Sequence, residues 1–191
     1  FAAVSVPALA HNAHDMLARA NGTTIRVASK SVRVRGVIES VLALPGYHGV
    51  LAYTLAEALW LAETIDDIVV GYPTADRDAL RTLATSETLA RRVTVMVDSV
   101  AQLDLIDAVI APSGREPIRV CLELDASWDS KTIGFTGVFR SPIRTREQAL
   151  LLASEIVSRP GFRLVGIMSY EAQIAGVVNR PPGKKVRGRL V

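Results

Sequence analysis

The sequence contains a single cysteine, Cys121, and no apolar run long enough to cross a membrane. One cysteine cannot form an internal disulfide, which is typical of proteins that work in the reducing cytoplasm. A membrane-spanning helix needs about 18 or more consecutive apolar residues, and we recognise no signal peptide. We therefore expect a cytoplasmic protein that has no membrane partner.

Excess charge of one sign is also scarce. The formal net charge is only +3, and the C-terminal region holds a basic cluster of Lys184, Lys185, Arg187 and Arg189. The remainder of the chain is close to neutral, so we expect no surface that binds nucleic acid. Apolar residues make up 49% and charged residues 21% of the chain, an ordinary composition for a globular domain.

Several catalytic and cofactor motifs are missing. No Gly-x-Gly-x-x-Gly follows a predicted strand, which argues against the main dinucleotide fingerprint, and no Gly-x-Ser-x-Gly elbow is present. His11 and His14 lie on a predicted helix without a third ligand, and His48 lies in a predicted loop. We therefore expect surface histidines and no metal site in this chain. Cys121, in the middle of a predicted strand, is expected to be a small core residue.

Lysine is scarce among the 22 basic side chains, and Lys30 stands at the end of an apolar segment, residues 24–30, that we predict as a buried strand. Only a primary amine can lose its proton and add to a carbonyl. Burial would lower the pKa of this lysine, and Arg26, on the same face of the strand, would lower it further. The alternative is a lysine that extends from a strand end into solvent. This segment alone does not separate the two interpretations.

Short apolar segments alternate with amphipathic ones along the chain. We predict strands at 24–30, 49–53, 67–72, 92–98, 118–125 and 164–170. We predict helices at 7–20, 32–44, after Thr54, at 75–89, after Ser99 and at 146–158, with Thr54, Ser99 and Thr145 as caps and Glu57 completing a capping box. Residues 1–6 are predicted as a further short strand, the stretch from Trp128 to Gly137 as a long loop, and 172–191 as a loop or frayed end.

This alternation predicts an α/β fold with a parallel sheet. Such a sheet either stays open and doubly wound or closes into a (β/α)8 TIM-type barrel, and the pattern favours the barrel. A barrel needs eight strands and only about six are predicted. We therefore expect residues 1–191 to be an incomplete barrel domain whose last strands lie beyond Val191.

The active site of a parallel barrel lies at the carboxyl ends of its strands. The predicted strands end there on Lys30, Tyr53, Tyr72, Asp98, Asp125 and Tyr170-Glu171. Asp98 is also explained as a helix cap and Tyr72 as a packed ring. Glu123 and Asp125 are expected to pair with Arg26 or Arg119, because an unpaired carboxylate inside the barrel would be costly.

Several segments follow one another in a specific order: Arg26-x-x-x-Lys30-Ser31, Gly49 to Ala52, Glu57-Ala58, Asp66 to Pro73, Val97-Asp98-Ser99, Glu123-x-Asp125 and Gly166 to Glu171. This order resembles the fold-type III pyridoxal-phosphate enzymes, the alanine racemase N-terminal domain superfamily, and most closely the branch of D-threonine aldolase and D-serine dehydratase. The branch usually shows Arg-Pro-His-x-Lys-Thr-His where this chain has Val27-Ala28 and Val32. Trp128 to Phe139 also replaces a shorter glycine-rich stretch, so we expect a different substrate pocket.

The resemblance implies a pyridoxal-phosphate enzyme that acts at Cα of a small amino-acid substrate, either a D-threonine aldolase-like lyase or a D-hydroxy amino acid dehydratase. It implies that Lys30 holds the cofactor covalently and then acts as a base, and that Tyr170 faces the cofactor ring. Arg26, Tyr53 and Asp98 are expected to complete the cofactor site. The resemblance places the phosphate-binding loop, the ligands of any divalent metal and a mostly β second domain beyond Val191. We also expect a homodimer.

Three other interpretations stay open. One is an alanine racemase-type amino-acid racemase, and another is a non-catalytic single-domain pyridoxal-phosphate carrier, which would end soon after an eighth strand. The third is a cofactor-free barrel that serves as an interaction scaffold and would show no cofactor absorbance.

Overall fold

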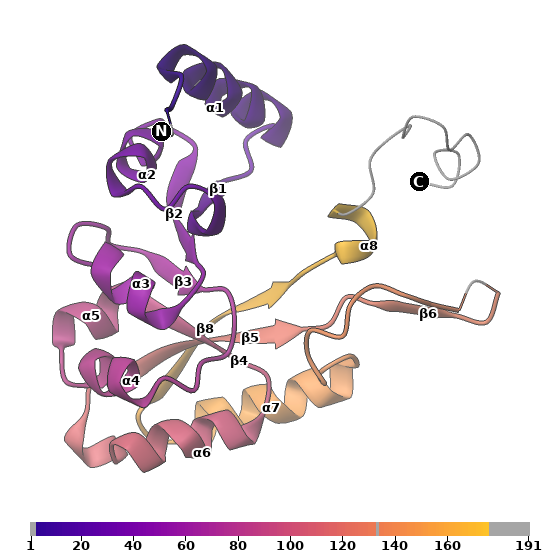
Figure 1. Ribbon diagram of the computed structural model, residues 1–191. Helices are drawn as coiled ribbons and strands as arrows, with labels where there is room; N and C mark the ends of the chain where they lie inside the picture. The colour runs from indigo at the N-terminus through magenta and orange to yellow at the C-terminus, as the bar shows by residue number, and fades with distance from the viewer. Residues whose placement is uncertain (1–2, 133, 176–191) are drawn as a thin grey trace.

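A sheet of six parallel strands forms the centre of the molecule (Figure 1). The computed structural model describes residues 3–132 and 134–175. The strands lie in the order β1-β2-β3-β4-β5-β8, and every neighbouring pair is parallel. They span Ile25–Ala28, Tyr47–Ala52, Ile68–Val70, Val93–Val97, Ile118–Leu124 and Phe162–Ser169. Chain order without reversal is the arrangement of a (β/α)8 barrel and differs from that of a doubly wound sheet. The prediction of a partial barrel is confirmed.

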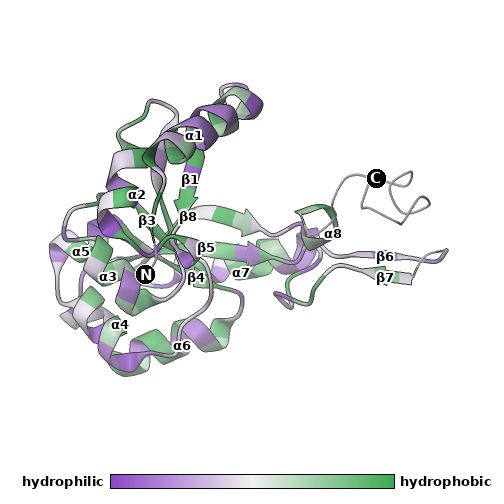
Figure 2. Cartoon of the chain, turned by 45° about the horizontal axis from the view of Figure 1, so that its top comes forward, coloured by the Kyte–Doolittle hydropathy of each residue, from purple (hydrophilic) through white to green (hydrophobic). Residues whose placement is uncertain are grey.

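Helices cover one face of this sheet. They are α1 (Val6–Ala20), α2 (Arg35–Leu42), α3 (Leu55–Leu61), α4 (Arg77–Ala84), α5 (Glu87–Arg92), α6 (Val100–Val109) and α7 (Arg146–Ser158). The short α8 (Ala172–Ala175) lies beyond the end of β8 (Figure 1), and the chain also contains the 3-10 turns η1 (Ser29–Ser31) and η2 (Pro112–Gly114). The main hydrophobic core lies between the two layers, where strand residues such as Val95 and Val120 pack in one cluster with Leu80 and Ile156 of the helices. Figure 2 shows the helices carrying both hydrophobic and hydrophilic residues, as this one-sided packing requires.

Two predicted elements at the start and middle of the chain are wrong. Residues 3–5 form no strand, and α1 begins at Val6 because Pro7 suits the first turn of a helix. The helix predicted at 75–89 is two helices, α4 and α5. Ser86 separates them because its hydroxyl accepts a hydrogen bond from the Leu89 N–H at 3.3 Å and starts a new helix.

The predicted caps are correct at Thr54 and Thr145 but not at Ser99. Thr145 forms a reciprocal capping box with Gln148 at the start of α7. The Ser99 side chain makes no capping hydrogen bond, and instead the Gln102 side chain accepts one from the Asp98 N–H at 2.8 Å. A longer side chain one turn into α6 thus binds the chain just before this helix.

The long loop predicted after the fifth strand contains an antiparallel hairpin of β6 (Trp128–Ser130) and β7 (Gly134–Thr136). Both ribbon views show it extending away from the main sheet (Figures 1 and 2). Its base is closed by the Ser127 hydroxyl, which donates to the Val138 carbonyl at 2.7 Å. Three-residue strands carry too little alternation to be recognised from sequence.

The predicted loop or frayed end at 172–191 is described only in its first residues, where α8 forms. The basic cluster of Lys184, Lys185, Arg187 and Arg189 lies outside the described residues. Within 3–132 and 134–175, no helix has the length and apolar character required to cross a membrane.

Candidate active site

Strand alternation divides the side chains of the sheet between the helix-covered face and an inner face. On β5, Val120 and Leu122 belong to the core against the helices, whereas Cys121 and Glu123 point the other way. A register irregularity between Val120 and Cys121 puts Gly166 opposite Cys121 and Met168 opposite Glu123. The same alternation brings Tyr170 to the inner face, as the sequence predicted.

A cavity of about 480 Å³ opens on the inner face at the carboxyl ends of the strands. Its walls come from β1, β2, β8 and the segments that follow β3 and β7. The lining residues are Arg26, Ala28, Lys30, Leu51, Ala52, Tyr53, Gly71, Tyr72, Arg140, Met168, Ser169 and Tyr170. Lys30 and Tyr170 therefore line one cavity although they come from the two edge strands of the sheet.

Lys30 lies in the turn after β1 and not at the end of the strand. The carbonyl of Ser29 accepts hydrogen bonds from the N–H groups of Val32 and Arg33, both at 3.0 Å, and these bonds turn the chain into η1. The expectation that Lys30 is buried is wrong, because β1 is an edge strand and the lysine side of the turn is exposed. Among the described residues its amine forms no ion pair, and it lies 5.6 Å from the centre of the Tyr53 ring.

Aromatic rings and cations contact one another in a series around the cavity. The rings of Tyr53 and Tyr72 meet edge to face, with centroids 5.5 Å apart. The Arg140 guanidinium lies over the Tyr72 ring at 4.4 Å and over the Tyr170 ring at 5.4 Å. Ring faces carry negative electrostatic potential, so each cation–ring contact is attractive. The series links Lys30, on the β1 side, to Tyr170, which follows β8.

Arg140 holds the centre of this arrangement. Its Nε donates to the Glu123 carboxylate and its Nη2 donates to the Gly71 carbonyl at 2.6 Å. The predicted partners of Glu123, Arg26 and Arg119, are wrong. Arg119 donates to Thr94 at 3.1 Å instead, because it lies near the amino end of β5 and points across to β4.

Buried carboxylates lie beneath Arg140. Glu123 is only 1% exposed, and its pKa is raised mainly by burial, which the hydrogen bond and charge of Arg140 oppose. Burial also raises the pKa of Asp98, against hydrogen bonds from Ser99 and Gln102. Asp98 and Asp125 add like charge near Glu123 and raise its pKa further. Asp98 lies at this carboxylate group and not among the residues that line the cavity.

Arg26 lines the cavity but is bound to a carboxylate. Its Nη2 lies 2.6 Å from Asp67 Oδ2, which also contacts His48 Nε2 at 3.2 Å. Gly49 allows this approach, because a Cβ at Gly49 would lie 2.6 Å from the Asp67 carbonyl oxygen. The positive φ of Gly49, 72°, favours glycine for a second reason.

The other residues considered in the sequence, Cys121, His11 and His14, do not line the cavity. Cys121 is buried, and burial raises the pKa of its thiol to about 11, which fits the predicted core role. His11 and His14 are exposed on α1. Over residues 3–132 and 134–175, no group of three or more His, Cys, Asp or Glu side chains is arranged to hold a metal ion.

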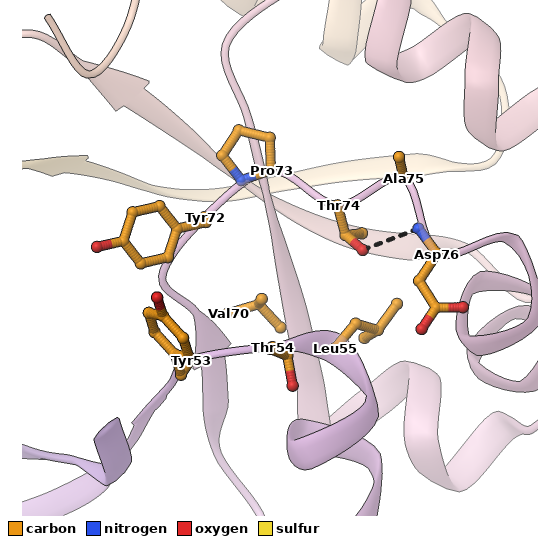
Figure 3. A pocket seen from close by; sticks show the side chains of 9 residues that line it. All are labelled: Tyr53, Thr54, Leu55, Val70, Tyr72, Pro73, Thr74, Ala75 and Asp76. Atoms are coloured by element: carbon orange, nitrogen blue, oxygen red, sulfur yellow. Dashed lines mark hydrogen bonds between the residues drawn. The ribbon is translucent and has the colours of Figure 1, made fainter. Parts of the chain in front are cut away.

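A second cavity, of about 390 Å³, shares Tyr53 and Tyr72 with the first (Figure 3). It lies toward the starts of α3 and α4, where Leu55, Val70 and Pro73 line it together with hydroxyl and carboxylate groups. One of its polar contacts is internal, since the Asp76 N–H donates to the Thr74 hydroxyl at 3.2 Å. Lys30 does not line this cavity, so we assign the candidate active site to the first.

Residues 4–182 match the family described as alanine racemase, N-terminal domain. The chain belongs to this family. A comparison with curated proteins found no match.

Solved structures show the same fold. The D-threonine aldolase from Filomicrobium marinum aligns with a TM-score of 0.64 and 20% identity, over 85% of this chain and 41% of that one. Alanine racemase from E. faecalis aligns with a TM-score of 0.63 and 21% identity, again over 85% and 41%. D-threo-3-hydroxyaspartate dehydratase from Delftia sp. HT23 aligns with a TM-score of 0.59 and 24% identity, over 87% of this chain and 41% of that one. This alanine racemase N-terminal domain thus spans 41% of the length of each of these chains.

The structure brings Lys30, Tyr53, Arg26 and Tyr170 of the sequence candidates to one cavity, and it adds Arg140. Sequence reasoning missed Arg140 because it lies between the predicted loop, which ends at Gly137, and the helix predicted at 146–158, in a stretch with other arginines and no predicted element. Two signals were present in the sequence. Glu123 required a cationic partner, and Arg140 is the first arginine in the chain after it.

We predict that Glu123→Gln weakens the pH dependence of stability. A raised pKa in the folded state means that Glu123 stabilises the fold at low pH and that this contribution is lost as pH rises from 4.5, its ordinary value, through the raised pKa. Glutamine is always neutral and still offers an oxygen to Arg140. Urea unfolding from pH 4.5 to about pH 7 should therefore show a smaller loss of unfolding free energy in the variant. Glu116→Gln, at an exposed carboxylate, is the control; equal slopes in both variants and the wild type would contradict this assignment.

Proposed function

We propose that this protein is a pyridoxal-phosphate-dependent enzyme that acts at Cα of an amino acid and that Lys30 binds the cofactor. The observation that carries the proposal is the primary amine of Lys30, which forms no ion pair among the described residues and lies at the wall of the cavity of about 480 Å³, beside a tyrosine ring. Membership of the alanine racemase N-terminal domain family supports it.

The cavity fits the ring end of this cofactor. Its volume is within the usual range for small-molecule sites, about 300–1,000 Å³, and its lining includes the apolar side chains of Ala28, Leu51 and Met168. A flat aromatic group suits the faces of Tyr53 and Tyr170, and an aldehyde suits the Lys30 amine. The phosphate would be held by residues outside those described, where we also place any metal ligands.

The residues of this chain then have defined roles. Bound pyridoxal phosphate supplies the electron sink for bond cleavage at Cα. Lys30 would hold the cofactor through its Nζ, with water as the leaving group, and its free amine would accept a proton as a general base. Arg140, fixed by Glu123 and the Gly71 carbonyl, presents its guanidinium to an anionic oxygen at the cavity wall. Tyr170 packs against the bound ring and offers its hydroxyl to a neighbouring polar group.

We further propose that the substrate is a D-β-hydroxy amino acid, cleaved as by an aldolase or dehydrated. The motif order from Arg26 to Glu171 supports this choice over a racemase. We also propose that the working protein is a homodimer with a further β domain and two more barrel strands. The strands would pair with β1 and β8, the sheet edges among the described residues.

Lys30 gives the direct test. Protein purified with pyridoxal phosphate should be yellow, and borohydride reduction followed by peptide mass spectrometry should find the cofactor on Lys30. Lys30→Ala should abolish reducible attachment, because arginine cannot replace a primary amine and Lys131 lies on the exposed hairpin turn. Lys131→Ala is the control and should keep full attachment. Label on Lys131, or on no lysine, would show that the proposal is wrong.

The reaction class is tested with substrates. D-Threonine should give glycine and acetaldehyde if the Cα–Cβ bond breaks, whereas a dehydratase should give a 2-oxo acid and ammonia from a D-β-hydroxy amino acid. Chiral chromatography of D- and L-alanine checks for racemisation in parallel. Racemisation with neither cleavage nor dehydration would reject the lyase proposal, and cofactor binding without any turnover would indicate a carrier.

Two substitutions at Tyr170 distinguish the packing role of its ring from the hydrogen-bonding role of its hydroxyl. Tyr170→Phe keeps the ring and removes the hydroxyl, so we expect turnover to fall by about tenfold or more while the cofactor stays bound. Tyr170→Ala removes the ring that lines the cavity and should also weaken cofactor retention. Retention is followed by absorbance after gel filtration. Full activity in Tyr170→Ala would place this residue outside the site.

A further inference from the structure

Ser29, the residue before the candidate cofactor lysine, is buried and hydrogen-bonded through both its side chain and its carbonyl. Ser29 is 0% exposed, and its hydroxyl donates to Glu57 Oε2 at 2.9 Å. Its carbonyl accepts the two hydrogen bonds that form η1. The backbone that carries Lys30 is therefore oriented through Ser29.

The same carboxylate oxygen also binds the backbone of Tyr53, whose ring lies near Lys30. Glu57 Oε2 accepts a second hydrogen bond, from the Tyr53 N–H at 2.9 Å. The Tyr53 ring is the one that lies 5.6 Å from Lys30 Nζ. One oxygen atom on α3 thus connects the turn after β1, which carries Lys30, with the residue after β2.

The sequence predicted a different role for Glu57, as the second half of a capping box with Thr54. Half of that box forms, because the Thr54 hydroxyl accepts from the Glu57 N–H at 3.2 Å. The carboxylate does not return to the Thr54 N–H but goes to Ser29 and Tyr53. The backbone N–H of Glu57 is therefore bonded in the cap of α3, whereas its carboxylate binds Ser29 and Tyr53 beside the cavity.

We propose that Glu57 is a positioning residue for Lys30, holding the amine against Tyr53 through Ser29 and the Tyr53 N–H. The proposal rests on the proposed function, in which Lys30 binds the cofactor. Hydrogen bonds to a carboxylate are stronger than those between neutral groups. Without it, the buried Ser29 hydroxyl has the Leu51 carbonyl, at 3.4 Å, as its remaining acceptor among the described residues, and the Tyr53 N–H loses its partner.

The test compares cofactor affinity in Glu57→Ala, Glu57→Gln, Ser29→Ala and the Ser29→Ala/Glu57→Ala double variant. Each alanine variant should raise the Kd for pyridoxal phosphate about tenfold or more, the loss expected for one hydrogen bond to a charged group. Glu57→Gln keeps an oxygen acceptor and should recover part of that loss. The double variant should be no weaker than the weaker single one, because both changes break the same connection.

Thr54→Ala is the matched control, because it removes the cap of α3 and leaves the Glu57 carboxylate in place. It should lower the melting temperature and leave the Kd for pyridoxal phosphate unchanged. If Glu57→Ala and Thr54→Ala lower the melting temperature alike and neither changes the Kd, Glu57 is only a helix residue and the proposal is overturned.

A second readout does not depend on the cofactor. Reductive methylation of the cofactor-free protein by formaldehyde and cyanoborohydride, followed by peptide mass spectrometry, gives the rate at Lys30 relative to exposed Lys131. This ratio should change about threefold or more in Glu57→Ala and Ser29→Ala, reflecting the lost fixed position, and stay the same in Thr54→Ala. If the wild type binds no cofactor on Lys30, the proposed function fails, and this ratio alone decides the positioning role. An unchanged ratio then overturns it.

Discussion

The parallel order of the six strands is the constraint on which the rest of this structure depends. Parallel strands joined by helices all end at the same edge of the sheet. Lys30, Tyr53, Tyr72 and Tyr170, which follow four different strands, therefore meet around one cavity. In the doubly wound order 3-2-1-4-5-6, β3 and β4 would not be neighbours, whereas here they pair.

Within that frame, the Arg140–Glu123 ion pair ties the segment after the hairpin to the inner face of the sheet. Glu123 is buried, so its carboxylate requires a cation, and removing one partner of a buried pair leaves an uncompensated charge. Arg140 also binds the Gly71 carbonyl and contacts two tyrosine rings. The shape of the cavity and the stability of the inner face are consequently linked through one side chain.

The strands, most helices and the partial barrel could be predicted from sequence because each depends on local periodicity and on capping residues. β5 and α7 lie within a residue of their predicted bounds. The short hairpin could not be predicted, since β6 and β7 have three residues each and their pairing is set by the turn. The division of residues 75–89 into two helices was missed because Ser86 can be either a helix residue or a cap.

The sequence by itself determined the parallel α/β class, the place of Lys30 near the carboxyl end of the first barrel strand and the family resemblance, because these follow from apolar spacing and residue order. Only the tertiary structure decided which charges pair. Arg26 binds Asp67, and Arg140 binds Glu123. The Glu57 carboxylate binds Ser29 and Tyr53 and does not complete the predicted capping box. These partners lie far apart in the chain or on different elements, and strand register and burial select among many carboxylates and arginines that look equivalent in sequence.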